Sequence, residues 1–220
     1  MPARAKPAMQ RRSVQTRERL LSAMDDLLKK GPFETITVSD LAARAGVSPA
    51  SIYQRFDNRD ALVAVLLELY VRKIEAWNRA DETAARAAEC ASLRDALITV
   101  AEAAWRQIEA LRYVMRPAYL YSRLRPDAAR EIWSTSEKRA LEGFKALLSR
   151  FRDDLGKQDL ARAASMTAYL MNMMFLGRLL HADDKSSWDL PRRPRAFAEA
   201  LADHVEGYLA ARRGVPDAQS

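Results

Sequence analysis

Small and hydrogen-bonding side chains gather at the start of a short predicted helix over residues 49–56. Ser48 is a good N-cap, and Pro49 suits the first helical position, where its missing N–H costs nothing. Ile52 and Phe56 are four residues apart and should face inward together. The residues left facing outward or partly outward are Pro49, Ala50, Ser51, Tyr53, Gln54 and Arg55. Such groups near a helix N-terminus suit contacts with phosphates and with the major groove of DNA.

A second short helix should precede this one and pack against it. Thr37 can cap it, with Asp40 at the third helical position completing a variant of the capping box. Gly46 should end it, because glycine adopts the left-handed conformation at low cost. Two short helices joined in this way over residues 37–56 form a helix-turn-helix, which commonly reads DNA. The same pattern also occurs as an ordinary hairpin in helical bundles, so the motif by itself leaves both interpretations open.

Signals for catalysis are weak. His181 and His204 lie far apart, without the spacing of metal ligands around them. The run H-A-D-D at 181–184 could imitate a metal site, but acids that follow a helix are usually solvated. The sequence has no nucleophile elbow and no glycine-rich phosphate loop. We therefore predict a protein that is not an enzyme and that uses no metal and no cofactor.

Composition points to an all-α protein with polyanionic partners. The chain has 220 residues, 49% of them hydrophobic, and only seven glycines. Its formal charge of +7 favours polyanions such as nucleic acid. The one cysteine, Cys90, excludes an internal disulfide and fits a reducing cytoplasm. No signal peptide is apparent, and the most apolar predicted helix, 159–181, is too short for a membrane span.

The order of predicted helices places the helix-turn-helix near the start of a long helical chain. Residues 1–13 are basic, contain two prolines that oppose a helix, and read as a flexible arm that is either a solvated tail or a DNA contact. The predicted helices other than the helix-turn-helix are 14–30, 59–80, 92–111, 127–151, 159–181 and 194–213. Residues 81–91 are either a loop or a continuing helix. Over residues 112–126, where Pro117 and Pro126 are punctuation, we expect one or two short helices, and at 153–158 a turn.

Three blocks in order resemble the N-terminal domain of the tetracycline-repressor (TetR/AcrR) family of bacterial transcription regulators. They are T-R-E-R-L-L-S-A-M-D-D-L-L-K-K-G (16–31), F-E-T-I-T-V-S-D-L-A-A-R-A-G-V-S (33–48) and I-Y-Q-R-F-D-N-R-D-A-L (52–62). The resemblance implies a three-helix DNA-binding domain at 14–60, followed by a larger helical ligand-binding and dimerisation domain at 61–213. Residues 214–220 form a loose tail.

The resemblance also implies roles for individual residues of the helix-turn-helix at 37–56, here called the reading motif. Thr37, Tyr53 and Arg59 match positions that touch phosphates. Pro49, Ala50, Ser51 and Gln54 match positions that face base edges, with Ser48 capping their helix. Gln54 is the best direct reader, because its amide can pair with adenine. Arg55 departs from the family's usual histidine and offers a phosphate or guanine contact, so the operator should be particular to this chain.

For the C-terminal part, the resemblance implies an effector cavity and a dimer through the helices at about 159–181 and 194–213. Candidate lining residues are Tyr70, Trp105, Tyr113, Met115, Tyr119, Trp133, Tyr169 and Met173. Aromatic side chains and methionines line apolar pockets, although each is also an ordinary core residue. The expected function is a ligand-responsive repressor that binds a near-palindromic DNA operator as a homodimer and is released by an apolar or aromatic small molecule. The alternatives are a regulator that answers to a protein partner and a basic interaction protein without sequence-specific DNA binding.

Overall fold

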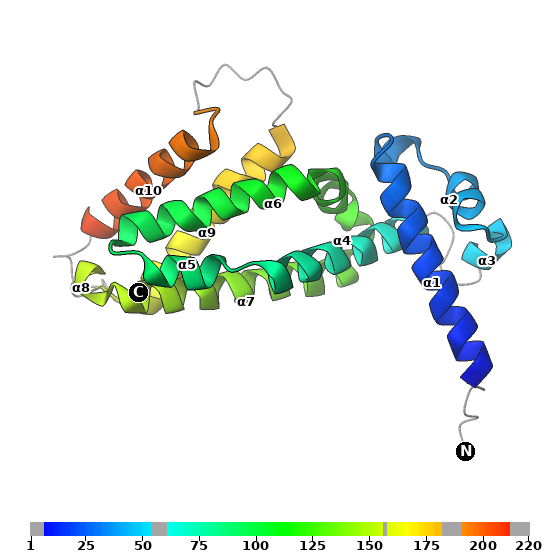
Figure 1. The fold of residues 1–220 in the computed structure, drawn as a ribbon, viewed down its shortest axis with the longest axis horizontal. Coiled ribbons are helices and arrows are strands. Elements are labelled where there is room, and N and C mark those ends of the chain that lie inside the picture. Colours follow the sequence, from blue (N-terminus) through cyan, green and yellow to red (C-terminus); the bar gives the residue numbers. More distant parts are fainter. Residues whose placement is uncertain (1–6, 54–60, 156–157, 182–190, 212–220) are drawn as a thin grey trace. The chain divides into compact units, whose positions relative to one another are not determined.

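All the regular structure that can be described in this chain is helical. The computed structural model describes residues 7–53, 61–155, 158–181 and 191–211, and within these ranges it contains no strand. The elements, in the order drawn in Figure 1, are α1 (Pro7–Leu28), η1 (Phe33–Thr35), α2 (Val38–Ala45), α3 (Pro49–Tyr53), α4 (Ala61–Ala80), α5 (Thr83–Glu89), α6 (Leu93–Tyr121), η3 (Ser122–Leu124), α7 (Pro126–Arg150), α8 (Arg152–Leu155), α9 (Leu160–His181) and α10 (Pro194–Ala211). The all-α prediction is confirmed.

The chain divides into two compact units. Unit 1 comprises residues 1–76 and 111–131, and unit 2 comprises residues 77–110 and 132–220. Three helices, α4, α6 and α7, contribute residues to both units. Unit 1 therefore holds the predicted DNA-binding segment together with most of α4 and the last turns of α6.

The first helix starts earlier than its sequence suggested. α1 begins at Pro7, so the prediction of a flexible arm over residues 1–13 is wrong for residues 7–13. Prolines oppose a helix in its interior, but Pro7 occupies the first helical position, where a proline is well tolerated. Residues 1–6 lie outside the described part of the chain.

The core of unit 1 is built from the apolar stripe of α1 and from buried side chains of the following helices. Leu20 and Met24 of α1 are fully buried, as are Leu41 of α2, Ile52 of α3 and Leu66 of α4. Phe33 of η1 and Ile36, which follows it, are also buried. The Phe33 ring lies 4.9 Å from that of Tyr121 (centroid to centroid), which ties η1 to the end of α6.

Two segments, 112–126 and 153–158, differ from the sequence expectation, and a third, 81–91, had two alternatives. α6 continues to Tyr121 through Pro117, where short separate helices were predicted. A proline inside a helix removes one backbone hydrogen bond, but the burial of Val114 and Ala118 on either side supports the continuous helix. The segment 81–91, left open, contains α5, and the turn predicted at 153–158 overlaps α8.

Unit 2 packs α9 and α10 around an aromatic cluster. Trp105 of α6 lies 5.4 Å from Phe197 of α10, whose ring is 5.5 Å from that of Phe175 of α9 (centroid to centroid). The guanidinium carbon of Arg178 lies 3.2 Å from the centroid of the Trp105 ring. Buried Gln158 donates from Nε2 to the backbone carbonyl of Leu209 at 2.5 Å and so joins the segment before α9 to α10.

A buried hydroxyl on α9 gives a stability prediction. Thr167 is 0% exposed, and its Oγ1 has no hydrogen-bond partner within the described structure. Valine has the same shape without the hydroxyl, so Thr167→Val should raise the free energy of unfolding by about 1 kcal/mol, as measured by urea denaturation. Thr99→Val is the control, because the Thr99 hydroxyl donates to the Asp95 carbonyl at 2.8 Å. Equal destabilisation by both substitutions would contradict the prediction.

Candidate nucleic-acid interface

The first helix of the reading motif is fixed by a complete capping box. The Asp40 backbone N–H donates to Thr37 Oγ1 at 3.1 Å, and Asp40 Oδ2 accepts from the Thr37 N–H at 2.9 Å. The Thr37 hydroxyl also donates to Asp40 Oδ2 at 2.6 Å. These bonds hold the pKa of the Asp40 carboxyl below its usual value. The cap predicted from sequence is confirmed, and it places the exposed Thr37 at the N-terminus of α2.

The turn between the two helices depends on one glycine. Gly46 has φ 65° and ψ 40°, in the left-handed region, as its sequence position predicted. The Val47 N–H donates to the Ala42 carbonyl at 3.0 Å and closes the end of α2. A turn of this kind lets α3 begin at Pro49, three residues after Gly46.

The second helix is short and is held by one buried side chain. Of the residues of α3, only Ile52 is buried, with 0% exposure. At the N-terminus, the Ser51 N–H donates to Ser48 Oγ at 3.2 Å, and the two serine hydroxyls are 2.8 Å apart. Tyr53 at the other end is 48% exposed. The N-terminal edge of α3 and the Tyr53 side chain are therefore exposed.

Most of the residues predicted to contact DNA come together on this motif. The exposed ones are Thr37, Ser48, Pro49, Ala50 and Tyr53, and Ser51 is partly exposed. Gln54, Arg55 and Arg59 lie outside the described residues. The described members form a small polar edge at the starts of α2 and α3, where backbone N–H groups and the helix dipole attract phosphate.

Helix α1 braces the motif on one side. Arg44 of α2 forms an ion pair with Asp26 of α1. Other pairs hold α1 to α4: Arg17 Nε lies 2.5 Å from Glu68 Oε1, and Arg72 pairs with Glu18. These pairs are largely exposed and contribute little stability singly, so their effect is to fix orientation.

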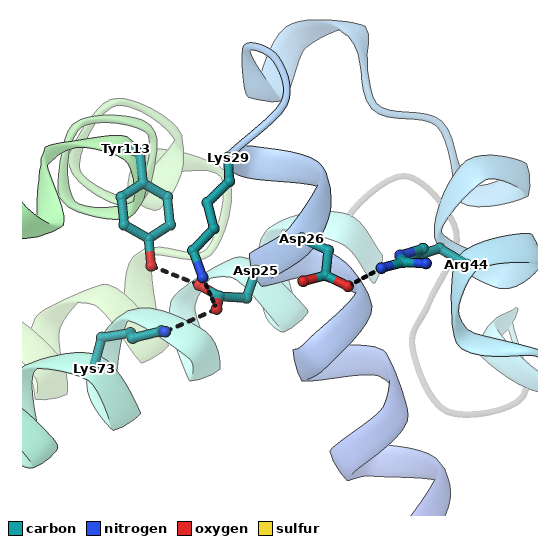
Figure 2. Close-up of polar contacts among 6 residues, drawn as sticks. All are labelled: Asp25, Asp26, Lys29, Arg44, Lys73 and Tyr113. Atoms are coloured by element: carbon teal, nitrogen blue, oxygen red, sulfur yellow. Dashed lines mark hydrogen bonds and ion pairs between the residues drawn. The ribbon is translucent and has the colours of Figure 1, made fainter.

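A more buried cluster surrounds Asp25 on the same helix (Figure 2). Lys29 Nζ and Lys73 Nζ each donate to Asp25 Oδ2 at 2.8 Å. The Tyr113 hydroxyl donates to Asp25 Oδ1 at 2.6 Å. No motif in the sequence pointed to this cluster. Its one local signal is the spacing of Asp25 and Lys29, four residues apart, since Lys73 and Tyr113 are 48 and 88 residues away.

The protonation states in this cluster favour the hydrogen bonds seen. Burial raises the pKa of the Asp25 carboxyl, but hydrogen bonds from Lys29, Lys73 and Tyr113 outweigh burial and leave it below its usual value. Burial, followed by the hydrogen bond to Asp25, raises the pKa of Tyr113 to about 12. At neutral pH Asp25 is therefore an ionised acceptor, and Tyr113 keeps the proton that it donates.

The candidate lining residues for an effector are divided between the two units. Tyr70, Tyr113, Met115 and Tyr119 belong to unit 1, whereas Trp105, Trp133, Tyr169 and Met173 belong to unit 2. Tyr70 and Trp105 are buried. Tyr169 and Met173 of α9 are 59% and 40% exposed. Their role in ligand binding stays a prediction, and the hydroxyl of Tyr113 has a different partner, Asp25.

Metal-binding and membrane-spanning features are absent from the described ranges. These ranges bring together no group of three or more His, Cys, Asp and Glu side chains suited to a metal ion. Asp183 and Asp184, part of the possible metal site at 181–184, lie outside the described residues. No helix in the described ranges has the length and apolar character that a membrane span requires.

Comparison with known proteins identifies the reading motif. Residues 20–66 match the sequence profile described as bacterial regulatory proteins, tetR family. The match runs from within α1 through η1, α2 and α3 into α4, and so covers the whole helix-turn-helix. None of the curated proteins matches the chain in sequence.

Solved structures share the fold over nearly the whole chain. A TetR-family transcriptional regulator from Mesorhizobium loti is 18% identical, with a TM-score of 0.57 over 91% of this chain and 97% of that chain. A transcriptional regulator from Pseudomonas aeruginosa is 21% identical, with a TM-score of 0.55 over 95% and 96%. The TetR-family regulator PfmR from Thermus thermophilus is also 21% identical, with a TM-score of 0.54 over 86% and 97%. What these proteins share with the present chain is the fold.

Proposed function

Through its N-terminal domain the chain belongs to the tetR family of bacterial regulatory proteins, and on this basis we propose that it regulates transcription by binding an operator. It acts in the cytoplasm as a non-catalytic repressor that occupies a near-palindromic site. The observation that carries this proposal is the edge formed at the starts of α2 and α3. There a capped helix, a left-handed glycine and exposed Ser48, Pro49, Ala50 and Tyr53 combine within the residues that match the family.

The edge at the starts of α2 and α3 suggests which residues contact DNA phosphates and which contact bases. The Tyr53 hydroxyl and Thr37 bind phosphates, which fixes the register of α3 without reading sequence. Ala50 and Pro49 contact the methyl group of a thymine, and Gln54, which follows α3 in sequence, pairs with adenine. Sequence preference should therefore depend on Gln54, whereas Tyr53 should affect all sequences alike.

A homodimer would supply two such edges. In α9 five partly or well exposed apolar residues repeat at intervals of three and four: Met166, Tyr169, Met173, Leu176 and Leu180. This spacing gives a seam on which a second helix can pack. We propose that α9 and α10 pair with their counterparts in a second copy of the chain. Two reading helices then bind half-sites ~34–36 Å apart.

A small molecule should control this binding from unit 2. The Trp105, Phe175 and Phe197 cluster is aromatic, with the guanidinium carbon of Arg178 3.2 Å from the centroid of the Trp105 ring. Trp105 Nε1 is buried without a hydrogen-bond partner in the described structure. A buried donor of this kind would gain from a ligand that accepts its hydrogen bond. We propose an apolar or aromatic effector that binds the DNA-incompetent form more tightly, since without that difference no equilibrium shifts.

The test is selection of DNA by the purified protein from a random duplex pool. We expect a near-palindromic sequence to be enriched. Tyr53→Ala should lower affinity for that sequence by roughly tenfold and affect unrelated duplexes in the same proportion. Gln54→Ala should instead reduce the preference for the selected sequence. Equal affinity of the wild type for all duplexes and for heparin would overturn the proposal and indicate a basic interaction protein.

A further inference from the structure

The Asp25 carboxylate joins three helices of unit 1. Lys29 follows α1 directly in the chain, Lys73 belongs to α4 and Tyr113 to α6, and all three donate to it. Both α4 and α6 have further residues in unit 2, namely 77–80 and 93–110. Asp25 therefore links α1 to α4 and α6, two helices that continue into unit 2.

The next residue of α1 faces the reading motif. Asp26 pairs with Arg44 of α2, and Figure 2 shows Asp25 and Asp26 directed toward different sides of α1. Two consecutive carboxylates thus place α1 between the helix-turn-helix on one side and α4 with α6 on the other. Any shift of α1 relative to α6 would be carried to α2 through this one helical turn.

The cluster is suited to fixing orientation rather than to holding the unit together. The apolar core around Leu20, Met24 and Leu66 is fully buried and does not depend on the direction of any one bond. Hydrogen bonds to a charged group are short and directional. The Asp25 side chain is 15% exposed and that of Lys73 29%, so water replaces a lost donor poorly.

We propose that Asp25 is a positioning residue for operator binding, and that Tyr113 and Lys73 are the contacts through which α6 and α4 set the position of the reading motif. The inference rests on the proposed function. Movement of α6 that withdraws the Tyr113 hydroxyl releases α1 and lowers operator affinity. Tyr113, which the sequence suggested as a pocket residue, acts in this scheme as the link between α6 and α1.

The chain offers a matched control for this proposal. Lys29→Met and Lys73→Met each remove one positive charge and one 2.8 Å hydrogen bond to the same oxygen. Of these two lysines, only Lys73 connects Asp25 to another helix. Tyr113→Phe removes the third bond without a change of charge and keeps the ring beside Lys29, whose Nζ is 5.8 Å from its centroid.

The experiment measures fluorescence anisotropy of the duplex that the wild type selects from a random pool. It is run at a temperature where circular dichroism shows every variant to be folded. Lys73→Met and Tyr113→Phe should each weaken binding by roughly tenfold, and Lys29→Met by less than about twofold. Lys73→Arg, which keeps the positive charge and a hydrogen-bond donor, should bind with nearly wild-type affinity. In the double variant of Lys73 and Tyr113 the two losses should not add fully, because both act on Asp25.

The outcomes separate this inference from the proposed function. If the wild type selects no sequence, the proposed function fails, and the inference fails with it. If the wild type binds its selected duplex but all three single variants bind it equally well, only the inference is overturned. An affinity loss for Lys29→Met as large as that for Lys73→Met would also overturn it, because then the charge near Asp25, and not the link between helices, would matter.

Discussion

Ile52→Ala should abolish most operator binding while leaving the rest of the chain folded. Ile52 is the one buried residue of α3 and is 0% exposed. Replacing a buried isoleucine by alanine costs about 2–5 kcal/mol. A helix this short has little stability without its packing, so the loss should fall mainly on the reading helix. We expect operator affinity to drop by roughly 100-fold or more, at about 1.4 kcal/mol per tenfold.

A graded pair of variants separates this effect from general unfolding. Ile52→Val removes one methylene and should cost only about 0.5–1.5 kcal/mol, with operator affinity reduced less than about tenfold. Hydrogen exchange should show faster exchange in α3 of the alanine variant, with slow exchange retained in α4 and α6. Binding by the alanine variant within about threefold of the wild type would show that α3 is not held by this side chain.

Local chemistry explains why the reading motif could be predicted from sequence. The Thr37 and Asp40 cap, the left-handed Gly46 and the inward Ile52 each depend on residues within a few positions of one another. These local signals can be recognised without knowledge of any long-range contact. For that reason the sequence predicted both the start of each helix in the motif and the exposed edge of α3.

Long-range packing explains what the sequence did not predict. The donors to Asp25 from α4 and α6 are distant in the chain, so no local pattern could reveal them. Pro117 reads as a helix end, and only the burial of its neighbours Val114 and Ala118 shows why α6 continues. An apolar stripe likewise does not say what covers it. Tyr169 is 59% exposed, and its predicted place in a pocket stays a prediction.

The exposed seam of α9 gives the second large prediction: Met173→Glu should convert the proposed homodimer into a monomer. Met173 is 40% exposed and stands at the centre of the three-and-four repeat with Met166 and Tyr169. In a dimer each carboxylate would be buried in an apolar seam without a partner, at a cost of several kcal/mol. A monomer has one reading helix, so it loses the gain from binding two linked half-sites, and operator affinity should fall by roughly 100-fold or more.

Met174→Glu is the matched control for the seam. Met174 is the next residue and is also 40% exposed, but it lies about 100° around the helix from Met173 and is three or four residues from no member of the repeat. The same added charge there should leave the dimer intact. Sedimentation velocity at micromolar concentration measures the mass, and titration of the selected duplex measures the affinity. If Met173→Glu sediments as a dimer with normal operator affinity, α9 is not the dimer helix; if both variants are monomers, repulsion between added charges, and not the seam, decides the association.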